Sequence, residues 1–309
     1  MKRILTLTCL TVCFAVLSAS AQQPDVGTWT EILANHYLVY PDQQYGFSGN
    51  VALKLDVWQS QDSKDPLPTV MYIHGGGWFF GDRTGAMPQL LPYLQKGWNV
   101  VNVEYRMSGQ ALAPGAVEDV RCALRWVNRN AEKFHFDTNR LIVTGHSAGG
   151  HLALMAGMLR TEDGFDNNCP AEEAWGEKPL KVAAIVNWYG ITDVSDLLDG
   201  ADRRTYAIEW LGGQQNREEI AKRVSPLSYV RPGVPPIITI HGDADPTVPY
   251  SNAVRLHEAL DKIGAVNQLV TVAGGKHGFQ AFDDAHTKDA YEKVFAFLYQ
   301  HVPNLEKTK

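Results

Sequence analysis

The chain has 309 residues, of which 45% are hydrophobic and 20% are charged. These are the proportions of an ordinary soluble protein, and the length is ample for a large hydrophobic core. The formal net charge is −6 and the basic residues form no cluster, which argues against nucleic acid and anionic lipid as partners.

The first residues have the pattern of a secretory signal peptide. Residues 2–3 are basic, residues 4–17 form an apolar run, and residues 19–21 read Ala-Ser-Ala. We expect cleavage after residue 21, giving a secreted or periplasmic protein. A membrane anchor is the alternative, but about fourteen apolar residues are too few to span a bilayer comfortably. Neither Cys9 nor Cys13 follows a small residue as a lipoprotein cleavage site requires, so we expect no membrane anchor.

Cleavage would leave two cysteines in the mature chain, Cys122 and Cys169. Export permits a disulfide between them. A disulfide also needs a short Cα–Cα distance, which spacing along the chain does not supply. The sequence therefore leaves open whether the two residues are bonded or are isolated thiols.

The first half of the chain opens with an expected antiparallel hairpin. Residues 35–40 and 51–57 have strand-like patterns, and turn residues at 41–50 would join them. The pattern then predicts, in order, a short apolar strand at 69–73 that runs into glycines, a helix at 88–95, a valine-rich strand at 99–105, a core-facing helix at 114–134 and a turn at 137–140.

Strands and helices continue to alternate to the end of the chain. The predicted strands are 141–144, 182–188, 236–240 and 269–272, and the predicted helices are 151–160, 206–211, 218–224, 252–263 and 288–302. This alternation predicts a mostly parallel sheet with helices on both faces. We expect a single α/β domain over residues 22–305 and a flexible tail at 306–309.

The central predicted strand ends in Gly-His-Ser-Ala-Gly-Gly at residues 145–150. Gly-x-Ser-x-Gly between a strand and a helix is the nucleophile elbow, which holds a serine hydroxyl, here that of Ser147, at the top of a sheet. The glycines have a physical reason, because a Cβ at position 145 or 149 would collide with the adjacent strand or helix. A chance match is the alternative, and the flanking strand and helix disfavour it.

A serine nucleophile needs a base, usually a histidine that a buried carboxylate orients. His277 stands on a glycine-flanked loop after the last predicted strand, and Asp243 and Asp245 follow the strand before it. Both loops lie at the carboxyl ends of parallel strands, where open α/β sheets place their sites. We expect His277 to be the base, with either aspartate as the acid. His241 and His74, at strand ends, are expected to be structural hydrogen-bonding residues.

Acyl transfer also needs hydrogen-bond donors for the oxyanion that develops on the carbonyl. Residues 74–78, His-Gly-Gly-Gly-Trp, follow the strand at 69–73, and glycine lets a backbone N–H approach a substrate closely. Ala148, next to the nucleophile, offers another amide. A nucleotide-binding loop is the alternative, but neither of its glycine patterns is present. No metal-ligand spacing occurs, so we expect no metal and no cofactor.

Together these motifs resemble the secreted α/β-hydrolase esterases of the hormone-sensitive-lipase-like group, in the bacterial branch that includes feruloyl and acetylxylan esterases. The resemblance extends from about residue 50 to 300. The motifs identify the superfamily, but they indicate the substrate much less specifically. The segments that carry it are His74–Trp78, Gly81-Asp82, Tyr105-Arg106, Gly145–Gly150, Tyr189-Gly190 with Asp193, Asp245–Pro249 and His277–Phe279.

The resemblance implies an α/β-hydrolase fold with Ser147 as nucleophile, His277 as base and Asp245 as acid. Asp245 is preferred to Asp243 because the family's acid stands directly ahead of an x-x-Val-Pro ending. The implied oxyanion hole consists of the backbone amides of Gly76, Gly77 and Ala148.

The surroundings of the site are less defined by the resemblance. Trp78 is expected to bind the substrate, and Asp82 and Arg106 are expected to form an ion pair or to brace the glycine-rich loop. Many relatives carry a large N-terminal helical cap, whereas this chain has only a hairpin there. Any lid must therefore come from residues 193–232, which favours an open site.

We expect a secreted serine carboxylesterase that hydrolyses short acyl or hydroxycinnamoyl esters, on plant polysaccharide or on small soluble molecules, through an acyl-enzyme. An amidase or peptidase on the same scaffold is one alternative, although the propeller domain of the prolyl-oligopeptidase relatives is missing. A non-catalytic binding protein with a hydrolase fold is the other, although all three triad residues are present. The sequence does not determine the acyl group, the alcohol or the oligomeric state.

Overall fold

The computed structural model describes residues 31, 33–170, 180–278 and 284–305. The expected signal peptide and the expected tail at 306–309 lie outside the described residues. Eight strands form one sheet: β1 (Tyr37–Ser48), β2 (Val51–Ser60), β3 (Leu67–Ile73), β4 (Asn99–Val103), β5 (Phe136–His146), β6 (Ala184–Trp188), β7 (Ile237–Gly242) and β8 (Asn267–Val272).

The sheet is mostly parallel, as the alternation of elements predicts. Its strand order is β1-β2-β4-β3-β5-β6-β7-β8. β1 pairs antiparallel with β2, and β2 pairs antiparallel with β4, whereas every pairing from β4 to β8 is parallel. The carboxyl ends of the parallel strands therefore meet at one edge, where loops from strands far apart in the sequence come together.

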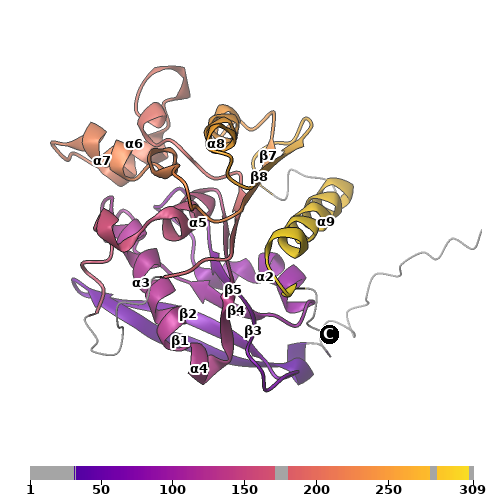
Figure 1. Cartoon of the computed structure of the whole chain (residues 1–309). Coiled ribbons are helices and arrows are strands. Elements are labelled where there is room, and N and C mark those ends of the chain that lie inside the picture. The colour runs from indigo at the N-terminus through magenta and orange to yellow at the C-terminus, as the bar shows by residue number, and fades with distance from the viewer. Residues whose placement is uncertain (1–30, 32, 171–179, 279–283, 306–309) are drawn as a thin grey trace, which may run out of the picture.

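Helices cover both faces of the sheet (Figure 1). The α-helices are α2 (Met87–Leu94), α3 (Gly115–Arg129), α4 (Ala131–Phe134), α5 (Ala148–Met158), α6 (Thr205–Leu211), α7 (Arg217–Arg223), α8 (Ser251–Lys262) and α9 (Asp284–His301). Buried side chains of α3, α5 and α8 belong to the core on one face, and those of α2 and α9 belong to the core on the other. None of the helices in the described part of the chain combines the length and the apolar character that a bilayer span requires.

Short helices complete the described elements. The 3-10 helices are η1 (Arg83–Ala86), η2 (Thr161–Asp163), η4 (Ser195–Leu197), η5 (Gly200–Asp202) and η6 (Pro226–Tyr229). Three of them, together with α6 and α7, lie in the segment between β6 and β7, which in Figure 1 stands above one end of the sheet. This segment contains residues 193–232, from which a lid was expected to come.

Two expected turns are wrong. Residues 41–50 were expected to link the hairpin, but β1 runs on to Ser48, and its register against β2 shifts between Tyr40 and Gln43 and again between Gln44 and Gly46. These irregularities absorb the turn-forming residues without ending the strand. Residues 137–140 lie within β5 because the start of that strand pairs with the start of β3. The expected helix at 114–134 divides at residue 130 into α3 and α4.

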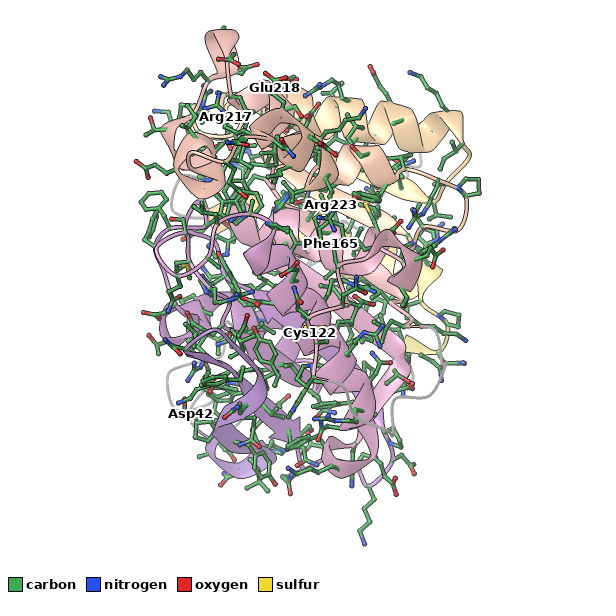
Figure 2. The ribbon with its side chains drawn as sticks, turned by 90° about the vertical axis from the view of Figure 1, so that its left-hand side faces the viewer. Asp42, Cys122, Phe165, Arg217, Glu218 and Arg223 are labelled. Atoms are coloured by element: carbon green, nitrogen blue, oxygen red, sulfur yellow. A yellow bond between two sulfur atoms is a disulfide. The ribbon has the colours of Figure 1, made fainter. Side chains whose placement is uncertain are left out.

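A disulfide joins Cys122 of α3 to Cys169, which resolves the question that the spacing of the cysteines left open. Nearby, the buried guanidinium of Arg121 donates to both carboxylate oxygens of Asp166. Figure 2 shows Cys122 within the layer of α3, below Phe165. The disulfide and the Arg121–Asp166 ion pair thus fasten the loop after η2 to the face of the sheet that α3 covers.

Loss of this disulfide is expected to destabilise the protein. The bond closes a loop with a sequence separation of 47 residues, for which chain entropy predicts about 4 kcal/mol. Urea unfolding of the double variant Cys122→Ala/Cys169→Ala should show a lower unfolding free energy than the wild type. A reducing agent should destabilise the wild type and leave the double variant unaffected, and equal responses of the two proteins would contradict the assignment.

Candidate active site

Ser147 lies on a sharp turn between the end of β5 and the start of α5. Its backbone angles, φ 56° and ψ −123°, are strained for a residue with a side chain. A Cβ on Gly149 would lie 2.1 Å from the carbonyl oxygen of Ile73 in β3, and a Cβ on Gly145 would lie 2.4 Å from that of Gly149. These approaches are too close for any side chain, which is the reason for glycine at both positions.

Three side chains from three loops meet at this turn. The His277 Nε2 atom lies 2.9 Å from the Ser147 hydroxyl oxygen, and its Nδ1 atom lies 2.7 Å from Asp245 Oδ2. The carboxylate can only accept, so Nδ1 carries the proton and Nε2 is free to accept the proton of the serine hydroxyl. The geometry is that of a nucleophile, a base and an orienting acid in a hydrogen-bonded chain.

The structure distinguishes between the two candidate acids. The Asp245 side chain is fully buried, and its second oxygen, Oδ1, accepts the backbone N–H groups of Thr247 and Val248 at 2.7 and 3.0 Å. Asp243 instead accepts the backbone N–H of Gly274, and no contact joins its carboxylate to His277 in the described structure. Of the two candidate acids, Asp245 is therefore the one whose carboxylate contacts His277.

The ionised form of Asp245 is strongly favoured. Burial opposes ionisation of this carboxyl, but hydrogen bonding from His241 and His277 and from the backbone outweighs burial, so the pKa of Asp245 lies well below its usual range. A negative charge next to His277 stabilises the imidazolium that would form when the histidine takes up a proton.

The glycine-rich loop after β3 is a tight turn. Gly76, Gly77 and Trp78 have φ angles of 115°, 58° and 63°, in the region that favours glycine. The loop closes on itself because Phe79 and Phe80 both donate their backbone N–H groups to the Gly76 carbonyl at 3.1 Å. A Cβ on Gly76 would lie 1.8 Å from the carbonyl oxygen of Phe80, so this tight turn requires glycine.

The three amides expected to form the oxyanion hole are available as donors. Those of Gly76 and Gly77 make no hydrogen bond to the described residues, and that of Ala148 stands at the first position of α5, where the helix offers no acceptor. Gly76 and Gly77 line the same cavity as Ser147 and His277. An oxyanion formed at the serine would lie between the loop and the helix N-terminus, where the N–H groups favour negative charge.

The serine opens into a cavity of about 640 Å³ with a mainly apolar lining. Phe79 and Phe80 line one side, with 44% and 59% of their surfaces exposed, and their rings pack edge to face at 4.9 Å. Tyr206 of α6 lines it too, and its hydroxyl donates to the carbonyl of Thr247. The sequence does not mark these three aromatic residues as part of a site, although Phe79 and Phe80 directly follow the glycine-rich segment at residues 74–78.

The expectation that Trp78 contacts the substrate is wrong. Its side chain is fully buried and is not part of the cavity wall. The indole ring stacks on Trp210 of α6 at 4.1 Å, and its N–H donates to His151 Nδ1 at 3.2 Å. Trp78 therefore fastens the glycine-rich loop to α5 and α6, while the next two residues face the cavity.

The expected ion pair between Asp82 and Arg106 is absent from the described structure. Asp82 caps η1 by accepting the backbone N–H of Thr84, whereas Arg106 donates to both oxygens of Asp119 in α3, at 2.7 to 3.0 Å. The glycine-rich loop is instead braced by Tyr105, whose hydroxyl donates to the carbonyl of His74 at 3.2 Å.

Among the described residues, no three His, Cys, Asp or Glu side chains gather as they would around a metal ion.

Comparison with known proteins places these features among esterases. A family model described as BD-FAE matches residues 55–260. Esterase LipC of Mycobacterium tuberculosis is 28% identical over 263 residues, covering 82% of this chain and 64% of LipC, and esterase LipQ of the same organism is 29% identical, with 61% of its length covered. The chain thus spans less than two thirds of the length of either relative.

Two solved structures match most of this chain and nearly the full length of their own chains. A truncated carbohydrate esterase from gut microbiota has a TM-score of 0.72 and 28% identity, with 85% of this chain and 97% of the other covered. A propionate-bound esterase of Thermogutta terrifontis has a TM-score of 0.70 and 27% identity, with 86% and 94% covered. The fold is therefore the α/β-hydrolase fold.

Burial of His151 behind the serine turn predicts a pH-dependent stability. His151 Nε2 donates to the Val224 carbonyl at 2.7 Å, and burial lowers its pKa to about 4 although this hydrogen bond opposes the shift. Between about pH 6.5 and 4 the unfolded chain binds a proton on this histidine that the folded protein does not bind. Stability should therefore fall by about 3 kcal/mol for this residue as the pH drops through that window.

The measurement is the unfolding free energy in urea at several pH values for the wild type and for His151→Gln, which keeps a donor for Val224. The variant should lose less stability than the wild type between pH 6.5 and 4. Some dependence should remain, because burial also lowers the pKa of His146 to about 4. Identical pH profiles would show that His151 is not the source.

Proposed function

Because the chain belongs to the BD-FAE family of α/β-hydrolase serine esterases, we propose that it is a carboxylesterase whose catalytic residues are Ser147, His277 and Asp245. The observation that carries the proposal is the hydrogen-bonded chain from the serine hydroxyl through both ring nitrogens of the histidine to a buried carboxylate. These contacts join residues from the loops after three strands of one sheet, next to a wide cavity.

In the proposed reaction, His277 Nε2 takes the hydroxyl proton as Ser147 Oγ attacks the ester carbonyl. The oxyanion accepts hydrogen bonds from the amides of Gly76, Gly77 and Ala148. The tetrahedral intermediate collapses to an acyl-enzyme, and the alcohol leaves with the proton from His277. A water molecule, deprotonated by the same histidine, then releases the acid and restores the serine.

We propose that the substrates are esters with a short acyl or a hydroxycinnamoyl group, free or attached to plant polysaccharide. Three features support this. The walls include the rings of Phe79, Phe80 and Tyr206, which suit an aromatic or short aliphatic group. One structural relative is a carbohydrate esterase from gut microbiota. Another, the Thermogutta terrifontis esterase, has propionate bound, which is a short carboxylate.

We also propose that the protein is exported, to the periplasm or out of the cell. The support is the basic, apolar and small-residue pattern of residues 1–21, together with the Cys122–Cys169 disulfide, because such bonds persist in oxidising compartments. N-terminal sequencing of the protein recovered from fractionated cells should begin at residue 22. Recovery of the uncleaved chain from the cytoplasm would overturn this part of the proposal.

Removal of the nucleophile should abolish ester hydrolysis. Ser147→Ala should leave a purified, folded protein with no measurable turnover of a short nitrophenyl ester, and it should not react with a fluorophosphonate probe. The wild type should react with the probe at Ser147, as identified by mass spectrometry. A variant that hydrolyses the ester as fast as the wild type would contradict the mechanism, and faster cleavage of a matched amide would indicate an amidase instead.

The two aspartates provide a matched pair of variants. Asp245→Asn should reduce kcat by about 10⁴-fold, because the neutral amide no longer holds His277 in the required tautomer. Asp243→Asn keeps an oxygen that can accept from Gly274 and should leave kcat little changed. Steady-state kinetics on the same ester distinguish the two, and equal losses would contradict the assignment of the acid.

The aromatic wall of the cavity should affect aromatic substrates selectively. Phe79→Ala and Phe80→Ala should lower kcat/KM for methyl ferulate about 2- to 10-fold more than for nitrophenyl acetate, since an aromatic contact contributes about 0.5–1.5 kcal/mol. Phe47→Ala removes an equally exposed ring on β1 outside the cavity and should change neither value. Equal losses on both esters would argue that the rings do not contact the acyl group.

A further inference from the structure

Asp245 contacts a second histidine besides His277. His241 lies on β7, four residues ahead of the aspartate, and its Nε2 atom is 3.3 Å from Asp245 Oδ2. This is the same oxygen that accepts from His277 Nδ1 at 2.7 Å. The side chains of His241 and Asp245 are both fully buried, so this contact is shielded from water.

The protonation of His241 follows from its other neighbour. Its Nε2 atom also lies 3.1 Å from the carbonyl oxygen of Val248, and a carbonyl can only accept, so Nε2 carries a proton. Its Nδ1 atom is buried and has no hydrogen-bond partner among the described residues, so a proton there would have no acceptor. The N–H on Nε2 is therefore donated to the Val248 carbonyl, and the same nitrogen lies 3.3 Å from Asp245 Oδ2.

This N–H comes from a rigid part of the molecule. β7 is an interior strand that pairs with β6 and β8, and His241 itself lies opposite Thr271 of β8. The loop that carries Asp245 otherwise holds the carboxylate through its own amides, those of Thr247 and Val248, which move with the loop. The His241 side chain ties both the carboxylate and the loop to the sheet.

We infer that His241 is a positioning residue, which holds the Asp245 carboxylate at the angle that orients His277. The negative charge of Asp245 Oδ2 then interacts with both histidines. This goes beyond the structural role expected of a histidine at a strand end, and it rests on the proposed function for its kinetic consequence. Loss of the N–H would leave the carboxylate held only by His277 and by the amides of its own loop, and displacement of a catalytic group by about 1 Å can cost about 10²-fold in rate.

The identity of the donor atom allows a sharp test. A glutamine amide nitrogen occupies nearly the position of histidine Nε2, whereas an asparagine amide nitrogen occupies nearly that of Nδ1. His241→Gln should therefore keep the contact and remain close to the wild type. His241→Asn should lose it, with a 10- to 100-fold decrease in kcat, estimated as about the effect of a misplaced catalytic group, and little change in KM.

The pH dependence of kcat/KM distinguishes a positioning role of His241 from a lower amount of folded protein. Without the N–H of His241, Oδ2 stabilises protonated His277 alone, so the acidic limb of the kcat/KM profile of His241→Asn should move to higher pH. Rates are expressed per active site after titration with a fluorophosphonate. An unchanged kcat and acidic limb in His241→Asn, or an equal loss in His241→Gln, would overturn the inference.

A proton NMR measurement makes the outcome independent of turnover. The Nδ1–H of His277 in its hydrogen bond to Asp245 should give a downfield resonance that His241→Gln preserves and His241→Asn shifts or broadens. If the wild type hydrolyses no ester while this resonance still responds to His241→Asn, the proposed function fails and the positioning role stands. If the wild type is an esterase and neither substitution changes the shift or width of this resonance, the positioning role fails.

Discussion

The candidate site depends on how closely the serine turn approaches strand β3. Glycine at 145 and 149 lets the turn lie against the carbonyl of Ile73, at a separation that no Cβ would permit. Because the oxyanion loop begins at His74, directly after Ile73, this contact also sets the distance between the loop and Ser147. The packing of two neighbouring strands thus positions Ser147 next to the loop proposed to supply the oxyanion donors, and the longer loops that carry His277 and Asp245 extend to this point.

The candidate catalytic residues could be predicted because each lies on the turn or loop that follows a strand of the sheet. The sequence shows the strands as apolar runs, parallel strands end at a common edge, and so the loops after β3, β5, β7 and β8 had to meet. The order of the residues along the chain then predicted Ser147 as the nucleophile and His277 as the base. The choice of Asp245 over Asp243 needed the family resemblance, because both aspartates lie in one turn and only the hydrogen bonds of the folded loop distinguish them.

The surroundings of these residues could not be predicted, because they depend on contacts between distant segments. Trp78 and Phe79 are adjacent and both aromatic, yet one is fully buried against Trp210 and the other faces the cavity. Nothing in the local sequence distinguishes them, because Trp78 is buried by its contact with Trp210 of α6, more than a hundred residues away. Arg106 likewise pairs with Asp119 because α3 presents a buried carboxylate beside it.

The attachment of α6 has a consequence for how such an enzyme can acquire new substrates. Tyr206 lines the cavity, but its hydroxyl holds the carbonyl of Thr247 in the loop of the acid, and Trp210 on the same helix stacks on Trp78 in the oxyanion loop. Substitutions in α6 that reshape the cavity will therefore also displace the two loops assigned to the chemistry. In adaptation or engineering, we therefore expect changes in this helix to alter specificity and turnover together, whereas the partly exposed Phe79 and Phe80 side chains of the cavity wall are the positions at which to alter specificity alone.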